Sequence, residues 1–352
     1  METSDKEHII YLDILRVIAC LLVILVHVSA KQLDAFSPKS FDYQISQFFN
    51  TFSIASPAIF FMLSGALFLN PASKDISIKK LWGRYILRMV VSYVFWSCLY
   101  TFIIWLPYYT FSAETVKAFI LEFFKGVPMY HLWFIPAIIS IYMVLPFLKP
   151  AFADTHRCRY YLGLFMVIQI FLPTLLKFDL PHGDLIQSLY MRTPYLLCIG
   201  YVGYFVLGYF LSVEKISRKT RMIIYAAGIL ALAAAVGVDG YLSVRQNNAV
   251  LLFNDLFALN SFLVVSAMFV AFRHIPWKKN RFTKAVTKLS KLTFGIYLLH
   301  PFIMQMLFGH CPFLLKLPAI VWIPTTTVAI FLCSTVVIWV ISKIPIANKY
   351  FM

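Results

Sequence analysis

The residues best suited to chemistry in this sequence are an arginine and a histidine within one apolar segment. Residues 11–30, YLDILRVIACLLVILVHVSA, are long enough to span a bilayer and contain Arg16 and His27. A charged side chain in hydrocarbon costs about 3 kcal/mol or more, so such residues normally face a protein interior or a wet cavity. Eleven helical residues give roughly 16 Å of rise and a net rotation of about 20°. Arg16 and His27 are therefore predicted to share one helix face at two depths.

The same helix face carries further polar residues. Helical spacing places Asp13, Cys20 and Val23 on the stripe of Arg16 and His27. The pattern predicts a polar seam that faces a partner, with the apolar residues facing lipid, and such a seam indicates a conduit. Cys20 has two possible roles, as a small packing residue or as a covalent acyl relay below His27. Packing is the commoner role of a buried cysteine.

Two more histidines adjoin aromatic or apolar residues. His131 lies in MYHLWF at 129–134, where interfacial aromatics are expected, so it is either a solvated residue or a catalytic one. His300 lies in LTFGIYLLHP at 292–301, inside an apolar span and after Tyr297. His27 and His300 are expected at comparable depths toward the outer side. Their positions favour a shared polar cavity over two histidines that are buried for unrelated reasons.

Basic residues are concentrated at two further places. The segment KKLWGRYILR holds Lys79, Lys80, Arg84 and Arg88, with the two arginines one helical turn apart. They either snorkel to the interface or bind an anionic ligand, since arginine forks suit phosphates. Residues 273–291 are the most basic stretch and could bind anionic lipid head groups or a polyanionic ligand, although membrane topology alone would explain most of that charge.

Composition determines which elements must position these residues. The chain has 352 residues, of which 61% are hydrophobic and only 13% charged. This composition predicts an all-α, polytopic transmembrane helical bundle. We expect one integral-membrane domain over residues 1–352, with a transmembrane core at about 9–343. Ten apolar spans are predicted, at 9–30, 45–69, 84–106, 131–149, 158–176, 193–212, 221–242, 251–272, 290–309 and 318–343.

The distribution of cations predicts the orientation of this bundle. Arg16 aside, connections on the side of the N-terminus carry twenty-two lysines and arginines, and the other side carries eight. This bias places both termini in the cytoplasm. The net charge of +16 is therefore explained by topology, and no nucleic-acid partner is expected. Residues 28–30 resemble a signal-peptidase site, but the preceding segment is acidic and long, so we expect no cleavage.

Three other features have structural readings. The six cysteines show neither CxxC nor metal-ligand spacing, so no metal site is predicted. FFMLSG at 60–65 follows Ser53, Ser56 and Pro57, which favours a kink or a close helix contact over a catalytic Ser64. Gly200, Gly203 and Gly208 indicate close helix packing in the sixth span.

Taken together, these motifs resemble integral-membrane acyltransferase family 3. The resemblance rests on Arg16 with His27, FFMLSG at 60–65, the basic entry at Arg84 and Arg88, HLWF at 131–134 and SKLTFGIYLLHP at 290–301. The resemblance covers about residues 9–343. Within the family, the chain most resembles the bacterial inner-membrane O-acetyltransferases that modify surface polysaccharides such as enterobacterial common antigen. Many members have an Arg-x-x-Arg motif at the entry to the third span. In this chain the first arginine of that motif is replaced by Tyr85, and Arg84 precedes it, so the resemblance does not identify which arginines contact phosphate.

The resemblance implies ten or so helices, acetyl-CoA as the donor and an essential Arg16–His27 pair. A glycan or lipid-linked saccharide would then be the acceptor in a bacterial inner membrane. Lys79, Lys80, Arg84 and Arg88 could hold the nucleotide, and the pantetheine arm could reach past Arg16 toward His27. His27 suits a general base, while His131, Tyr297 or His300 could stabilise the oxyanion. Arg16 is assigned to donor binding or to cavity structure with Asp13.

Two other function classes fit parts of the pattern. A secondary transporter or a flippase for lipid-linked glycans would have similar helices and basic loops, but it predicts an internal repeat, which we do not find. A non-catalytic component of a polysaccharide assembly complex would leave the arginine and histidine seam without a purpose. The sequence does not distinguish acetyl from other acyl donors, identify the acceptor or give the oligomeric state.

Overall fold

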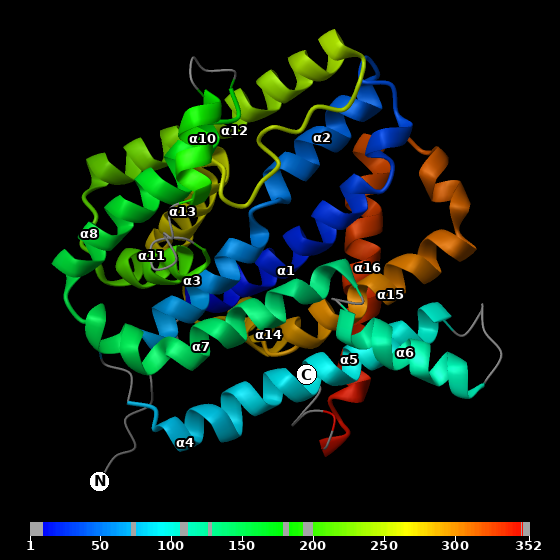
Figure 1. The fold of residues 1–352 in the computed structure, drawn as a ribbon, viewed down its shortest axis with the longest axis horizontal. Helices are drawn as coiled ribbons and strands as arrows, with labels where there is room; N and C mark the ends of the chain where they lie inside the picture. Colours follow the sequence, from blue (N-terminus) through cyan, green and yellow to red (C-terminus); the bar gives the residue numbers. More distant parts are fainter. Residues whose placement is uncertain are drawn as a thin grey trace. The chain divides into compact units, whose positions relative to one another are not determined.

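A computed structural model describes residues 10–71, 75–105, 112–125, 129–178, 183–192, 200–345 and 347, and all regular elements in these ranges are helices (Figure 1). The longer helices are α1 Ile10–Ala30, α2 Phe41–Ser53, α3 Ser56–Phe68, α5 Leu87–Trp105, α6 Ala113–Lys125, α7 Phe134–Ala151, α8 Thr155–Phe165, α10 Gly183–Arg192, α11 Val202–Val213, α12 Arg218–Gln246, α13 Leu259–His274, α14 Arg281–Ser290, α15 Thr293–His310 and α16 Ala319–Ile341. The shorter ones are η1 Leu33–Ala35, α4 Ile78–Lys80, η2 Leu81–Ile86, η3 Tyr130–Trp133, η4 Met166–Phe171, α9 Leu172–Leu175 and η5 Pro312–Lys316.

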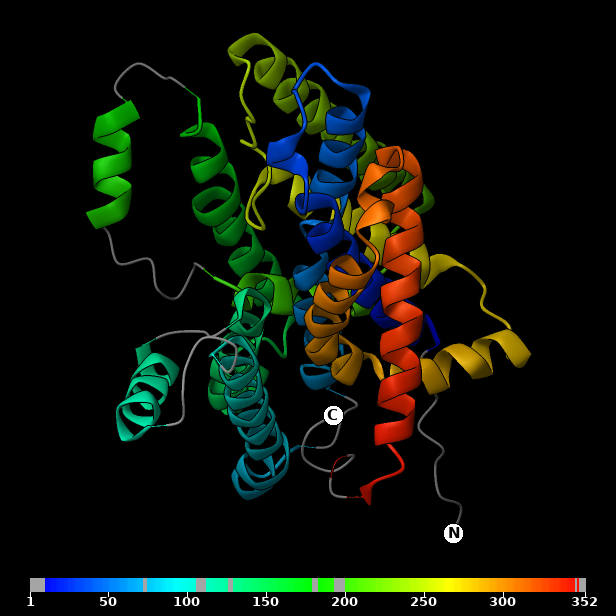
Figure 2. The same ribbon diagram turned by 90° about the vertical axis from the view of Figure 1, so that its right-hand side faces the viewer.

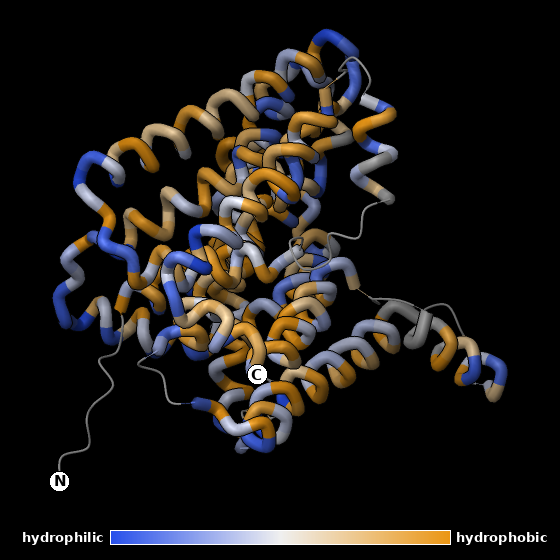
Figure 3. The backbone as a smooth tube through the Cα atoms, turned by 60° about the vertical axis from the view of Figure 1, so that its left-hand side comes forward, coloured by the Kyte–Doolittle hydropathy of each residue, from blue (hydrophilic) through white to orange (hydrophobic). Residues whose placement is uncertain are grey.

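The helices confirm an all-α polytopic protein. Within the described ranges, seven helices are long and apolar enough to cross a bilayer, and α14 with α15 make an eighth if they form one span bent by 68°. Two of the expected spans contain the shorter apolar helices α11 and α13. Figure 3 shows the long helix α12 with hydrophobic colours along its middle and hydrophilic colours at both ends, as expected of a membrane-crossing helix.

The chain divides into two compact units. The first contains Met1–Ser73 with Ala151–Thr335, and the second contains Lys74–Pro150 with Val336–Met352. The first unit therefore holds α1, α2, α3 and α8 to α15. The second holds α4 to α6 and nearly all of α7.

Helix α1 lies inside the first unit, which corrects the expectation that its apolar residues face lipid. In its most apolar stretch 78% of the residues are buried, against 17% for α12. Helices α2, α3, α13, α14 and α15 all pack against α1. Hydropathy alone could not distinguish lipid from protein as the surroundings of α1, because both are apolar. The candidate seam therefore lies within the protein.

The glycine motifs produce the expected close helix packing. A Cβ atom added to Gly65 of α3 would lie 1.7 Å from the Phe205 carbonyl oxygen of α11. One added to Gly208 of α11 would lie 2.0 Å from the Met62 carbonyl oxygen. Gly203 instead meets the ring of Phe165. Gly200 precedes α11 with φ +90°, so it serves a turn and not a helix contact. The helix is also interrupted by a turn at residues 54 and 55, just before Pro57, and this turn separates α2 from α3.

The helix expected over residues 251–272 is wrong for its first third, which is not helical. Residues 251–258 form turns and irregular backbone before α13 begins at Leu259. The apolar run there resembled a helix in composition, but polar side chains from neighbouring helices bind its backbone, as described below. Residues 193–199 of the expected sixth span lie outside the described ranges.

Candidate functional site

The polar face of α1 packs against α14 and α15 along a continuous seam. The Cys20 thiol donates to the carbonyl oxygen of Thr293 at 3.6 Å, and the rings of His27 and His300 stack with centroids 5.5 Å apart. Each contact joins residues 273 positions apart, so α1 and α15 run parallel in one register over seven residues. The predicted seam and its partner are thus confirmed for this pair of helices.

The N-terminal end of this seam is organised by Asp13. Its two carboxylate oxygens accept hydrogen bonds from the Thr287 and Ser290 hydroxyls of α14, both at 2.8 Å. The Arg16 guanidinium lies 3.7 Å from the same carboxylate and is the more exposed partner, with side-chain exposures of 29% for Arg16 and 5% for Asp13. Asp13 therefore links α1 to α14 and places Arg16 beside that junction.

The C-terminal end of the seam brings two histidines together. The rings of His27 and His300 are inclined by only 16°. His300 is fully buried, and its Nδ1 lies 2.6 Å from the carbonyl oxygen of Tyr297. A carbonyl only accepts, so Nδ1 carries the proton, and in the neutral ring Nε2 is an acceptor. The tilted ring of Tyr297 lies 6.0 Å from that of His300. The expected proximity of His27 and His300 is confirmed, and the polar cavity that they were expected to share stays a prediction.

Cys20 occupies the middle of the seam. It is 1% exposed, and its thiol is engaged by the Thr293 carbonyl oxygen. A neutral thiol that donates a hydrogen bond in an apolar interior is a weak nucleophile, because the thiolate is the reactive species. The contact supports a packing role for Cys20.

A polar contact beside His27 was missed by the sequence reasoning. The Asn50 side chain of α2 donates from Nδ2 to the Val26 carbonyl oxygen at 3.0 Å and to the Ser29 hydroxyl at 3.1 Å. Asn50 is 2% exposed, and its Oδ1 has no hydrogen-bond partner among the described residues. The signal was available in α2, where Tyr43, Gln47 and Asn50 recur at helical spacing inside an apolar protein.

The second unit holds the other candidate residues. His131 lies on η3, just before α7, with its ring edge-on to Tyr100 of α5 at 5.4 Å and next to Tyr130. Its neighbours are therefore aromatic, as the sequence indicated.

The basic entry to α5 differs in detail from its prediction. Lys79 and Lys80 end α4, Arg84 lies in the π-helical turn η2, and Arg88 is the second residue of α5. Lys79, Lys80 and Arg84 are exposed, whereas Arg88 is half-buried and its Nε has no partner among the described residues. The two arginines therefore differ in exposure, and a π-helical turn separates Arg84 from α5.

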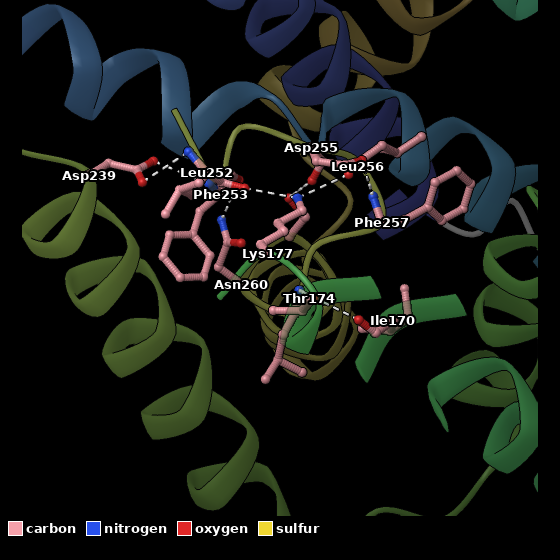
Figure 4. Close-up of polar contacts among 12 residues, drawn as sticks. Ile170, Thr174, Lys177, Asp239, Leu252, Phe253, Asp255, Leu256, Phe257 and Asn260 are labelled. Carbon is pink, nitrogen blue, oxygen red and sulfur yellow. Dashed lines mark hydrogen bonds and ion pairs between the residues drawn. The ribbon is translucent and has the colours of Figure 1, made fainter. Parts of the chain in front are cut away.

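A second polar cluster in the first unit holds the loop between α12 and α13 (Figure 4). Asp239 of α12 accepts hydrogen bonds from the backbone N–H groups of Leu252 and Phe253 at 3.1 and 3.2 Å. Lys177 donates to the Leu252 carbonyl oxygen at 2.8 Å and pairs with Asp255 at 3.1 Å. These contacts satisfy buried backbone groups, so the cluster is a structural anchor for the loop.

Comparison with known proteins places this arrangement in a family. A family model described as an acyltransferase domain matches residues 9–343. Comparisons with curated proteins and with solved structures found no match. The matched range contains both the seam of α1 and the basic entry to α5.

Proposed function

Since the chain belongs to the membrane acyltransferase family 3, we propose that it transfers an acetyl group from cytoplasmic acetyl-CoA to a glycan hydroxyl. The acceptor is a cell-surface or lipid-linked saccharide, and the enzyme is a multi-pass protein of the bacterial inner membrane. The observation that carries this proposal is the stacked pair of His27 and His300 at one end of a seam whose other end holds Asp13 and Arg16.

His27 acts as the general base in this proposal. A sugar hydroxyl is a weak nucleophile at neutral pH, and a positioned histidine typically supplies about 10²- to 10⁴-fold. His27 removes the hydroxyl proton as the oxygen forms its bond to the thioester carbonyl carbon. The carbon–sulfur bond then breaks, and the proton passes to the departing thiolate of CoA. Atoms and charges balance without a covalent enzyme intermediate.

The oxyanion requires a hydrogen-bond donor near the same carbon. In its neutral form His300 presents an acceptor at Nε2, because Nδ1–H is directed to the Tyr297 carbonyl oxygen. His300 could donate to an oxyanion only as an imidazolium, whereas a tyrosine hydroxyl donates when neutral. We therefore favour Tyr297 as the oxyanion donor and His300 as the residue that orients His27. The catalytic role that the sequence suggested for His131, which belongs to the second unit, stays a prediction.

Cationic residues at the entry to α5, in the second unit, are one candidate set for holding the phosphates of the donor. Lys79, Lys80 and Arg84 are exposed and Arg88 is half-buried, and charge-assisted contacts from such groups suit the phosphates of CoA. Arg16 lies near the N-terminal end of α1, on the seam that leads to His27, where its charge would also attract the donor. Its ion pair with Asp13 gives it a structural role as well.

The proposal is tested with the His27→Gln variant. We expect membranes that contain this variant at normal abundance to lose at least about 100-fold in acetyl transfer, the lower end of general-base catalysis. Mass spectrometry of surface glycans, compared with a deletion strain, would reveal the missing acetyl mass. The Cys20→Ala variant is the matched control in the same helix and should remain active. Near-normal acetylation by His27→Gln would refute the mechanism, and an inactive Cys20→Ala variant at normal abundance would favour the covalent relay.

A further inference from the structure

Helix α14 carries an aligned set of cations. Arg281, Lys284 and Lys288 of α14 and its C-cap residue Lys291 follow at i, i+3, i+7 and i+10, which confines them to an arc of about 80° when the helical geometry is extended to the cap. All four side chains are exposed. Within the described ranges, none of them forms an ion pair with an acidic residue. We call these four residues the cationic stripe.

The orientation of the cationic stripe is fixed by the neighbouring face of α14. Thr287 and Ser290 attach that face to Asp13, one helical turn before Arg16 on α1. Figure 2 shows α14 turning away from α15, with which it makes an angle of 68°. The cationic stripe therefore ends at Lys291, the residue after Ser290, which binds Asp13 at the N-terminal end of the seam that leads to His27 and His300.

Topology alone does not explain this alignment. The start of α12 carries Arg218, Lys219 and Arg221 on the same predicted side of the membrane. Helical geometry spreads those three over roughly 160°, and their helix is mostly exposed along its length. The positive-inside rule sets how many cations lie in the cytoplasm, not on which helix face they lie. The alignment of these cations on one face of α14 is the observation on which the inference rests.

We propose that the cationic stripe binds the phosphate groups of the acetyl-CoA donor, an inference that rests on the function proposed above. Several phosphates lie at one end of that donor and the reacting thioester lies at the other. From Thr293 at the start of α15 to His300 the helix rises by only about 10 Å. A donor whose phosphates lie along α14 would therefore direct its acyl end into the seam of α1 and α15.

The test compares two donors and one triple variant. In proteoliposomes of neutral lipid, Lys284→Gln with Lys288→Gln and Lys291→Gln should raise the KM for acetyl-CoA about tenfold, which is about 1.4 kcal/mol. Exposed ion pairs each contribute little, so three changes are needed for a clear effect. The KM for acetyl-pantetheine, which lacks phosphates, should be unchanged. Direct binding of CoA to the purified protein, without any acceptor, should weaken by a similar factor.

The matched control removes three exposed cations elsewhere on the same predicted side. Lys215→Gln with Arg218→Gln and Lys219→Gln should leave the KM for acetyl-CoA and the affinity for CoA unchanged. An unchanged KM in the α14 variant, or an equal rise with acetyl-pantetheine, would refute the inference. So would a defect that occurs only in vesicles with anionic lipid, which would assign the stripe to lipid phosphates. A further outcome separates this inference from the proposed function. If the variant loses CoA binding and the wild type does not acetylate any glycan, the inference about the donor site stands and the proposed acceptor is rejected.

Discussion

Asp13 has the most consequential contacts of any single residue in the seam. It accepts two hydroxyl hydrogen bonds from α14 and lies next to the Arg16 guanidinium, although it is only 4% exposed. Removing a buried acceptor leaves its donors and its counterion to find other partners. Residues such as this one explain why an acidic side chain is tolerated near the start of an apolar helix.

We predict that Asp13→Ala lowers the stability of the detergent-solubilised protein by about 1–3 kcal/mol. The physical reason is the loss of the acceptor for Thr287 and Ser290 together with the counterion of Arg16. Thermal unfolding monitored by fluorescence would measure the change. Asp184→Ala is the matched control, because Asp184 is exposed on α10 and should leave the melting temperature unchanged. Equal melting temperatures for the Asp13 variant and the wild type would contradict this account of the junction.

At the scale of elements, the contact of α3 with α11 depends on glycine. Gly65 and Gly208 let the two backbones approach so closely that an added Cβ would overlap carbonyl oxygens. Small residues allow such approaches in membrane proteins, where dispersion between closely packed helices replaces much of the hydrophobic effect. Helix α3 of this pair packs against α1, so the close contact of α3 with α11 also supports the seam.

Gly65→Ala and Gly208→Ala should each destabilise the protein by about 1–3 kcal/mol, the usual cost of overpacking. The obstacle is backbone, which cannot rotate away as a flexible side chain would. Gly237→Ala provides the control inside α12, since nothing lies within 4 Å of its added Cβ. That change should be neutral or stabilise by up to about 1 kcal/mol, because alanine favours helix over glycine. Comparable melting temperatures for all three variants would exclude close packing as the role of Gly65 and Gly208.

At the scale of the whole molecule, orientation in the membrane decides which substrate reaches which end of the seam. The cation bias predicts that the connection between α13 and α14 is cytoplasmic. The cationic stripe and the junction at Asp13 would then face the compartment that supplies acetyl-CoA. The stacked histidines would lie toward the outside, where a surface glycan is accessible.

Cysteine labelling tests this orientation. In a cysteine-free background, Lys279→Cys should resist an impermeant thiol reagent in intact cells and react after permeabilisation. Gln246→Cys, at the C-terminal end of α12 and on the predicted outer side of the membrane, should react in intact cells. Both positions are exposed, so a difference in labelling would report sidedness and not burial. Labelling of Lys279→Cys in intact cells would reverse the orientation and remove the cytoplasmic assignment of the donor end.

The sequence by itself determined the helical class and most of the membrane-spanning elements. Twenty-residue apolar runs admit little besides helices in a bilayer, because every backbone polar group must be paired within the segment. The sequence also predicted that Arg16, Cys20 and His27 share one face, since helix geometry is local. It failed at residues 251–258, because the carboxylate that accepts hydrogen bonds from the backbone of this loop, that of Asp239, belongs to another helix.

Only the tertiary structure decided what that face meets. Contacts between residues 273 positions apart, such as His27 with His300, depend on how separate helices pack, and hydropathy does not encode partners. The same holds for Asn50 beside Val26, and for α14, whose cations were visible as charge while their alignment beside Asp13 was not. Local periodicity fixes the direction of a side chain around its own helix, whereas long-range packing fixes its neighbours.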